Sequence, residues 1–429
     1  MRDTVDPTPT DWNSRAMQKR IRARYRAEKR FKFYGLFAVL LSAGFLAFLL
    51  VTMISNGARG FTQTQIAVPV NFAASDLFLE SSSLEGDGAA QALAGADFEG
   101  LVEEAAREAY GADGEDLVSP AAWLKVREAV SDDPELLNGE QTFWLQASTA
   151  LDFASRGEVK GRQAQRPERQ AMMARYERLE DADRVRRSLS QNFLVNSDSS
   201  DPTQIGIWGA LKGSLLTMIV TLAIAFPIGV LSAVYLEEYA PRNRWTDMIE
   251  VSINNLAAVP SIIFGLLGLA VFLNTFHLPR SAPIVGGLTL ALMTMPVIVI
   301  AGRNAIKSVP PSIRDAAYGV GASPVQVLSH HVLPLSLPGI LTGTIIGMSR
   351  ALGETAPLLL IGMRAFVVEP PDGFTDPATV LPVQIFLWSD ELDPGFVEKT
   401  SAAIITLLAF LLAMNAIAIW LRNRYEQRW

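Results

Sequence analysis

Six blocks of this chain are apolar and long enough to cross a lipid bilayer as helices. A transmembrane helix needs about 20 consecutive, mostly apolar residues. Blocks that meet or approach this length cover residues 31–54, 207–236, 249–276, 283–301, 337–363 and 401–421. The stretch between the first two blocks, residues 55–203, is as polar as a soluble domain. The pattern therefore predicts an all-α polytopic membrane protein with six transmembrane helices and a soluble insertion between helices 1 and 2.

The insertion at 55–203 is long enough to have its own hydrophobic core. Residues 65–72 alternate apolar and polar side chains, which is typical of a β-strand. Pro69 predicts an edge position for this strand, because proline donates no backbone hydrogen bond. Helical periodicity predicts amphipathic helices at 90–110, 120–130, 143–156 and 169–189. We expect a mainly helical α+β domain with a structural or docking role.

The distribution of charge predicts how the chain is oriented. Residues 1–32 contain ten Lys or Arg and four Asp or Glu residues, so a basic cytoplasmic tail (1–30) precedes the first span. Counting crossings from this tail places 55–203 outside, and places the loop 304–336 and the tail 422–429 inside. A basic arm also occurs in nucleic-acid-binding proteins, but here an apolar span follows at once. We therefore expect the lipid bilayer, and no nucleic acid, as a partner.

Residues that carry enzymatic chemistry are scarce in this chain. It has no cysteine, and two of its three histidines are adjacent, which leaves no thiolate metal site and no cysteine nucleophile. No G-x-x-x-x-G-K-[ST] motif occurs, so any ATP would have to be bound by another chain. We expect no catalytic residue, no metal site and no cofactor, and the composition argues against an enzyme.

The predicted cytoplasmic loop has the signals of two short helices around a glycine hinge. Pro311 suits the first turn of the first helix, where a missing N–H costs nothing. Gly321 suits a left-handed turn after that helix. Ser323 and Pro324 are typical of an N-cap and the first residue of a second helix. We expect this second helix to stop before Pro334.

The spacing in this loop resembles the EAA motif of permeases in bacterial ABC importers. In that family a Glu-Ala-Ala triplet is followed by three residues, a Gly, nine residues and then I-x-L-P. The matching positions are Asp315, Ala316, Ala317, Gly321, Leu333 and Pro334, with Asp315 in place of Glu and His331 in place of an aliphatic residue. The resemblance implies that the loop 304–336 docks onto cytoplasmic ATPase subunits and couples ATP hydrolysis to transport.

Two further segments narrow the resemblance. Residues 259–266 (V-P-S-I-I-F-G-L) and 349–359 (S-R-A-L-G-E-T-A-P-L-L) are similar to permeases of phosphate-specific (Pst) ABC importers, and the second favours their A-type subunit. The resemblance covers about 205–429 and implies the type I importer permease fold. It also implies that a periplasmic phosphate-binding protein delivers phosphate to a path formed with a C-type sister permease, and that two cytoplasmic ATP-binding subunits drive transport.

This resemblance places the chain in the bacterial inner membrane, with both termini in the cytoplasm and residues 55–203 in the periplasm. Two alternatives stay open. A permease for another oxyanion, such as sulfate or molybdate, would share the same coupling loop. A membrane-anchored sensor would instead use the 55–203 domain as its active part and would work without the loop.

Arg350 and Glu354 are charged residues within the predicted fifth span. They are four residues apart, so on one helix their side chains share a face and pair. An unpaired charge at the membrane centre costs about 2.5–3.5 kcal/mol on insertion scales. We expect Arg350 to line the substrate path and offer a guanidinium to the passing anion, with Glu354 holding it in place. The alternative is that the two charges only neutralise each other and stabilise helix packing.

Overall fold

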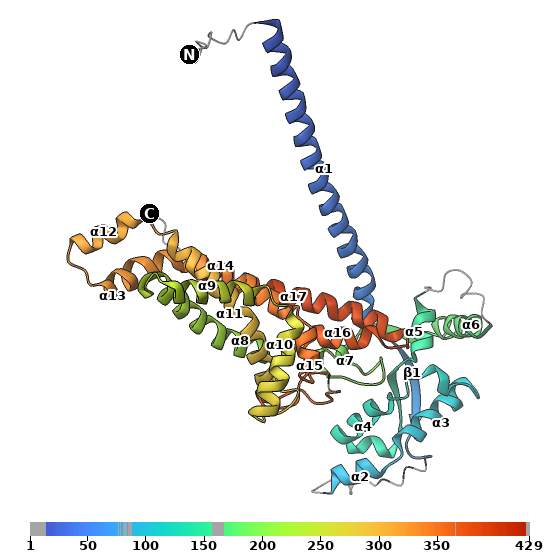
Figure 1. The fold of residues 1–429 in the computed structure, drawn as a ribbon. Helices are drawn as coiled ribbons and strands as arrows, with labels where there is room; N and C mark the ends of the chain where they lie inside the picture. The colour runs from blue at the N-terminus through green and yellow to red at the C-terminus, as the bar shows by residue number, and fades with distance from the viewer. Residues whose placement is uncertain are drawn as a thin grey trace, which may run out of the picture. The chain divides into compact units, whose positions relative to one another are not determined.

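The computed structural model describes residues 14–75, 77, 79, 84, 88–156, 167–364 and 366–425 (Figure 1). The tails predicted at 1–30 and 422–429 lie partly outside these residues. The strands are β1 Thr62–Asn71, β2 Glu140–Gln146 and β3 Val185–Leu189. The α-helices are α1 Arg15–Gly60, α2 Ala89–Gly95, α3 Phe98–Tyr110, α4 Trp123–Asp132, α5 Thr149–Ser155, α6 Pro167–Asp181, α7 Gln191–Val195, α8 Trp208–Val234, α9 Arg244–Ala257, α10 Ser261–Gly268, α11 Pro283–Lys307, α12 Pro311–Gly319, α13 Pro324–Val327, α14 Leu333–Leu352, α15 Ala356–Leu360, α16 Leu381–Ser389 and α17 Gly395–Tyr425.

Helix α1 is a single helix of 46 residues and extends beyond the predicted span 31–54 on both sides. At 1.5 Å per residue it is about 69 Å long, more than twice the ~30 Å hydrocarbon core of a bilayer. Its first turns therefore have to extend into water or headgroups. They carry the basic residues of the predicted tail, and Lys32, just beyond that tail, forms an ion pair of 2.6 Å with Glu28.

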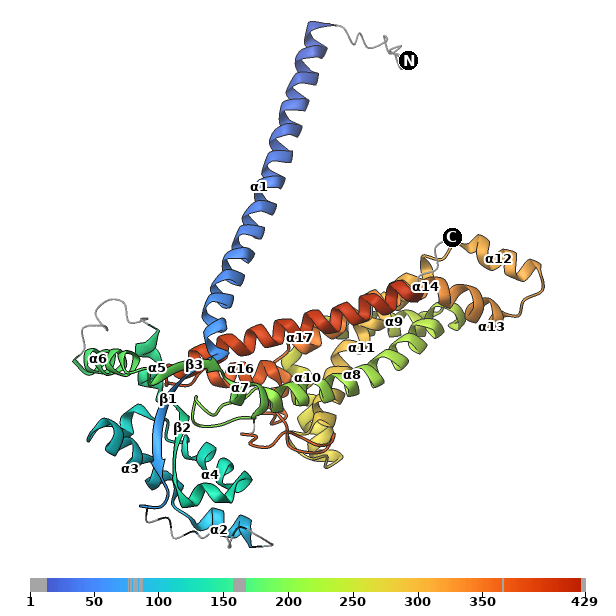
Figure 2. The same ribbon diagram turned by 180° about the vertical axis from the view of Figure 1, so that it is seen from behind.

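The long apolar helices α8, α11, α14 and α17 run side by side in both views (Figures 1 and 2). Helix α11 packs against α8 and α14, and α14 packs against α17. Five of the described helices are long and apolar enough to cross a membrane, or six if one bent pair counts as a span. The predicted polytopic helical fold is therefore confirmed. The C-terminal end of α17 and helix α12 lie at the same end of this bundle.

The third predicted span, 249–276, is not a straight helix. Helix α9 and the helical stretch from Ser261 to Thr275 meet at an angle of 100°. The bend lies at Val259–Pro260, where proline lacks an N–H and disfavours helical geometry in the residue before it. This segment is thus either a broken span or a re-entrant loop rather than a simple crossing.

The fifth predicted span, 337–363, has different limits at both ends. At its start, a π-helical turn (Leu328–Val332) joins α13 directly to α14, so Pro334 lies in the first turn of α14 and does not stop the preceding helix. At its end, α14 stops at Leu352 with Gly353 as its cap, and the short α15 begins at Ala356. The expectation of one helix through residue 363 is wrong.

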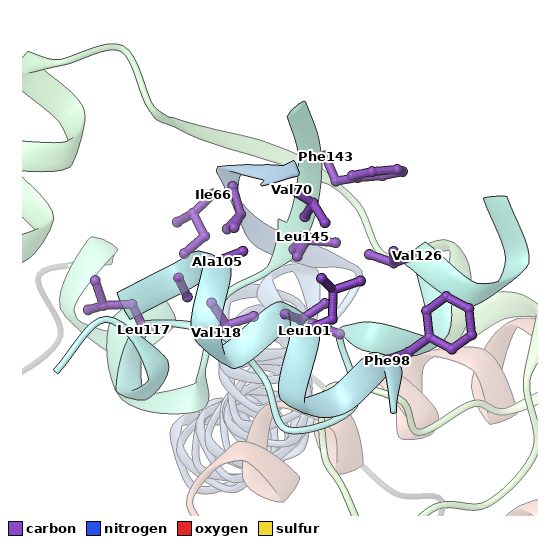
Figure 3. Close-up of a cluster of buried hydrophobic side chains, with 14 of the residues drawn as sticks. Ile66, Val70, Phe98, Leu101, Ala105, Leu117, Val118, Val126, Phe143 and Leu145 are labelled. Carbon is purple, nitrogen blue, oxygen red and sulfur yellow. The ribbon is translucent and has the colours of Figure 1, made fainter. Parts of the chain in front are cut away.

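The soluble insertion folds around a three-stranded antiparallel sheet of order β2-β1-β3. Figure 3 shows its core, in which Ile66 and Val70 of β1 and Leu145 of β2 lie beside Leu101 and Ala105 of α3. The expected α+β character is confirmed in outline. Two of the predicted helices are partly wrong, because 143–156 contains the end of β2 before α5, and 169–189 contains β3 after α6.

Strand β1 is central in this sheet, although Pro69 predicted an edge. Strand β3 pairs with β1 only as far as Ile66, opposite Val185. At Pro69 one side of β1 is therefore without a neighbouring strand, while Thr142 of β2 lies opposite on the other side. A proline is tolerated at this position because only one of the two ladders extends past it.

Candidate functional site

The loop between α11 and α14 has the hinge that its sequence predicts. Helix α12 opens with Pro311 in its first turn and ends at Gly319. Gly321 has φ +87°, in the left-handed region that favours glycine. Ser323 caps α13, and its capping box with Gln326 satisfies N–H groups at both positions. The loop thus consists of two short helices whose ends are set by their own proline, glycine and serine residues, joined by a turn at Gly321.

One face of the loop packs on the bundle and the other is open. Ala317 is buried in an apolar cluster with Val309, Val327 and Val332, whereas Asp315 and Ala316 are exposed. Leu333 and Pro334 are half-buried where the loop joins α14. Three large apolar side chains nevertheless remain in solvent: Tyr318, Val325 and Val320, the last of which is 86% exposed. An open apolar surface beside an acidic side chain is typical of a docking surface.

A group of ion pairs holds the base of this loop. Arg303 of α11 pairs with Glu250 at 2.5 Å and lies 3.5 Å from Glu237. Arg314 of α12 pairs with Glu238 at 2.8 Å and also donates to the carbonyl of Ile306. Sequence reasoning missed this group. The signal was the acidic pair that ends the second span, together with the basic residues that flank the loop.

Arg350 and Glu354 form the predicted pair in a different setting. The Arg350 Nε and a Glu354 carboxylate oxygen are 3.4 Å apart. Arg350 lies in the last turn of α14, and Glu354 lies in the non-helical junction before α15, so neither occupies the middle of a helix. The Arg350 side chain is 52% exposed and that of Glu354 is 19% exposed. Helix α14 is held to α17 close by, where Ser349 bonds to Asn415 at 2.8 Å.

A second charged cluster joins the soluble domain to the start of α17. The Arg156 guanidinium, only 7% exposed, contacts Glu398 at 2.5 Å and Asp152 at 2.6 Å, and also donates to the carbonyl oxygen of Thr62. Next to it, buried Lys399 donates to the carbonyl oxygen of Gly60 at 2.9 Å. The soluble domain therefore contacts the bundle at the start of α17, whereas α12 lies near the other end of that helix (Figure 1). No motif in the sequence indicated this cluster.

Arg156→Met is expected to destabilise the chain by about 3–5 kcal/mol, because it leaves the Glu398 carboxylate buried without its cation. Thermal unfolding of the detergent-purified chain measures the effect, and several degrees of loss are expected. Arg178→Met, at an exposed arginine on α6, is the matched control and should change little. Adding Glu398→Gln should recover part of the loss. An unchanged unfolding temperature in Arg156→Met would show that the cluster contributes no net stability.

Asp198 is a partly buried carboxylate in the segment between α7 and α8. Burial raises the pKa of its carboxyl above the ordinary value, although the hydrogen bond from the Trp388 indole acts in the opposite direction. The indole Nε1 donates to Asp198 at 3.0 Å. Because the folded pKa is raised, the native state loses stability as pH rises through the interval above 3.8, the unfolded value.

Asp198→Asn is therefore expected to raise the unfolding temperature at pH 7. Asparagine keeps an oxygen that accepts the Trp388 hydrogen bond and removes the cost of the buried charge. A gain of about 1 kcal/mol would shift the temperature by ~2–4 °C in a domain of 150–250 residues. The difference between the two proteins should shrink near pH 4. A variant that is less stable than the parent at pH 7 would contradict this account.

The described residues contain no group of three His, Asp or Glu side chains that could hold a metal ion. The predicted site residues are thus found in two places, the loop between α11 and α14 with its ion-paired base, and the Arg350–Glu354 pair at the end of α14. A bundle of apolar helices with an exposed hinged loop at one end is the architecture of a polytopic membrane protein that offers a docking surface at that end.

Comparison with known proteins agrees with this class. Residues 209–429 match the family "Binding-protein-dependent transport system inner membrane component", and residues 18–165 match a domain of unknown function (DUF3333). The chain belongs to the family of binding-protein-dependent transport system inner membrane components. It is thus a subunit of a multi-pass membrane transporter and not an enzyme.

Individual relatives resemble the membrane half. The probable ABC transporter permease protein YqgI of Bacillus subtilis is 30% identical over 249 residues, which cover 54% of this chain and 83% of the relative. The phosphate transport system permease protein PstA 1 of Mycobacterium tuberculosis is 31% identical over 218 residues, covering 51% and 70%. The PstA protein of Yersinia pestis is 32% identical over 227 residues, covering 51% and 74%.

Proposed function

We propose that this chain is the A-type permease subunit of an ATP-driven importer of inorganic phosphate. The observation that carries the proposal is the similarity of its membrane half to phosphate transport permeases, each matched over more than two thirds of its length. The hinged loop and the Arg350 guanidinium supply the two functions that such a subunit needs. One is a docking surface for ATP-binding subunits, and the other is a cation that binds the transported anion.

In this function the chain forms the path with a C-type sister permease, and a periplasmic binding protein delivers phosphate. Two cytoplasmic ATP-binding subunits dock on the loop. The exposed apolar side chains Tyr318, Val320 and Val325, with Asp315 beside them, support such docking. Asp315 would meet a basic group of the ATPase, and the ion pairs of Arg303 and Arg314 would pass its movement to the bundle.

The test is uptake of radiolabelled phosphate by proteoliposomes that hold the assembled transporter. Phosphate should be taken up with ATP, and excess sulfate or molybdate should not compete. Competition by either oxyanion would favour the alternative substrate. Removal of the loop between α11 and α14 separates transport from sensing, because a sensor based on the soluble domain would keep its response while a permease would lose all uptake.

The soluble domain is proposed to lie in the periplasm and the loop in the cytoplasm. A single cysteine placed at Ser131, exposed on α4, should react with a membrane-impermeant thiol reagent in intact spheroplasts. A cysteine at Ser312, exposed on α12, should react only after the membrane is opened. The chain has no native cysteine, so the introduced cysteine is the only residue of this chain that the thiol reagent can label. The reverse pattern of labelling would invert the proposed topology.

A further inference from the structure

The soluble domain contains a cavity of about 520 Å³ that is lined by residues of its sheet, of helix α4 and of the segment 191–204. Gln63 and Gln65 alternate along β1 and so point to one face, away from buried Ile66, and Gln146 of β2 lies opposite Gln65 in the register. Asn192 of α7 and other residues of the segment 191–204 complete this amide-rich side. The opposite wall is helix α4. The volume is within the range of ordinary small-molecule sites.

A hydrogen-bond network makes the floor of the cavity rigid. The Gln146 amide, only 7% exposed, donates to the side-chain oxygen of Gln63 and, at 2.8 Å, to the carbonyl oxygen of Thr203. Its oxygen accepts from Asn192 at 3.3 Å and from Gln204 at 2.7 Å. Both N–H groups and both lone pairs of Gln146 are therefore used, which fixes the orientation of its neighbours.

The same network leaves other amide groups available to a ligand. Within the part of the chain that the structure describes, the NH₂ groups of Gln63 and Gln65 and the side-chain oxygens of Asn192 and Asn196 have no hydrogen-bond partner. The cavity thus presents hydrogen-bond donors and acceptors together, and Gln146, whose own hydrogen bonds are all formed, holds them in place. A ligand with several groups that both donate and accept would satisfy them.

The charges at the cavity favour a neutral ligand. Lys125 and Arg127 line it together with Glu128 and Asp132, so their charges cancel. Lys125 is already bonded to the carbonyl oxygen of Trp144 at 2.8 Å, and Arg127 lies over the Trp123 ring. The domain as a whole is acidic, with thirteen Lys or Arg against twenty-five Asp or Glu in residues 61–200, which disfavours an anion.

We propose that this cavity binds a small neutral carbohydrate, a mono- or disaccharide whose hydroxyl groups pair with the free amides. Its ligand is independent of the transported substrate, because the cavity belongs to the soluble domain. One wall, the segment 191–204, leads directly into helix α8 at Trp208. A ligand in the cavity would therefore contact the segment that connects the soluble domain to the bundle.

The test is isothermal titration of the full chain in nanodiscs with glucose, N-acetylglucosamine, maltose and inorganic phosphate. At least one sugar should bind with a Kd below about 1 mM, and phosphate should not. Gln63→Met removes one free donor and the oxygen that accepts from Gln146, and it should weaken binding at least about tenfold. Ser131→Trp, on the α4 wall, fills the cavity from an exposed position and should abolish binding. Gln141→Met, an exposed glutamine of β2 outside the cavity, is the matched control and should bind as the parent does.

Three results would overturn the proposal. No heat with any of the three sugars would exclude carbohydrate as the ligand class. Phosphate binding that is lost in Lys125→Gln would make the cavity an anion site. Sugar binding that survives in Ser131→Trp would place the ligand elsewhere on the chain. Unfolding temperatures of the variants identify any that fail to fold, and Gln63→Met then provides the independent measurement.

Discussion

Gly321→Pro is expected to abolish transport while the chain still inserts and assembles. Proline requires φ near −65°, whereas Gly321 has φ +87°, so the turn between α12 and α13 cannot form as it is. A backbone distortion of about 3 kcal/mol corresponds to roughly a 100-fold loss of correctly docked loop. The measurement is ATP-driven phosphate uptake per assembled complex, with ATP hydrolysis followed in parallel. We expect hydrolysis to continue without uptake.

Two substitutions sharpen this test. Gly319→Ala is the matched control, because Gly319 has ordinary backbone geometry and open space around it, and it should transport normally. Asp315→Lys reverses the charge of an exposed side chain without altering the hinge, and it should also uncouple hydrolysis from uptake. Wild-type uptake in Asp315→Lys would show that this side chain is not needed for the coupling contact. Wild-type uptake in Gly321→Pro would show that the left-handed turn at Gly321 is not needed for coupling.

Arg350→Gln is expected to reduce phosphate uptake by at least about 100-fold in a complex that still assembles. The Arg350 side chain is half exposed on the isolated chain, so few packing contacts depend on it. A guanidinium offers bidentate hydrogen bonds that match a phosphate, and a lysine ammonium does not. Arg350→Lys should therefore keep the charge and still transport poorly. Glu354→Gln should have a milder effect, because it only loosens the position of the guanidinium.

Uptake has to be normalised to the amount of assembled complex. This normalisation separates a role of the Arg350–Glu354 pair in binding phosphate from a role in helix packing. If Arg350→Gln lowers the yield of complex but each complex transports normally, the pair serves helix packing. Arg364→Gln is a control at an exposed arginine outside the spans, and it should leave both yield and uptake unchanged.

The sequence by itself determined those features that depend on neighbouring residues. Blocks of apolar residues predicted the membrane helices, because a helix in lipid satisfies its own backbone groups. The loop was equally predictable, since the left-handed turn at Gly321 and the cap at Ser323 follow from the local chemistry of those residues. The spacing of Asp315, Ala316 and Ala317 indicated the same transporter class as the family match.

Tertiary structure alone decided the features that depend on distant partners. Pro69 is tolerated in a central strand because β3 ends before reaching it. Arg156 meets Glu398 across 242 positions of sequence. The amides of Gln63 and Gln146 meet because two strands pair in one register. Local periodicity reports which face of an element is apolar. It does not report which distant polar group will share that face, because such pairs form only when the whole chain has packed.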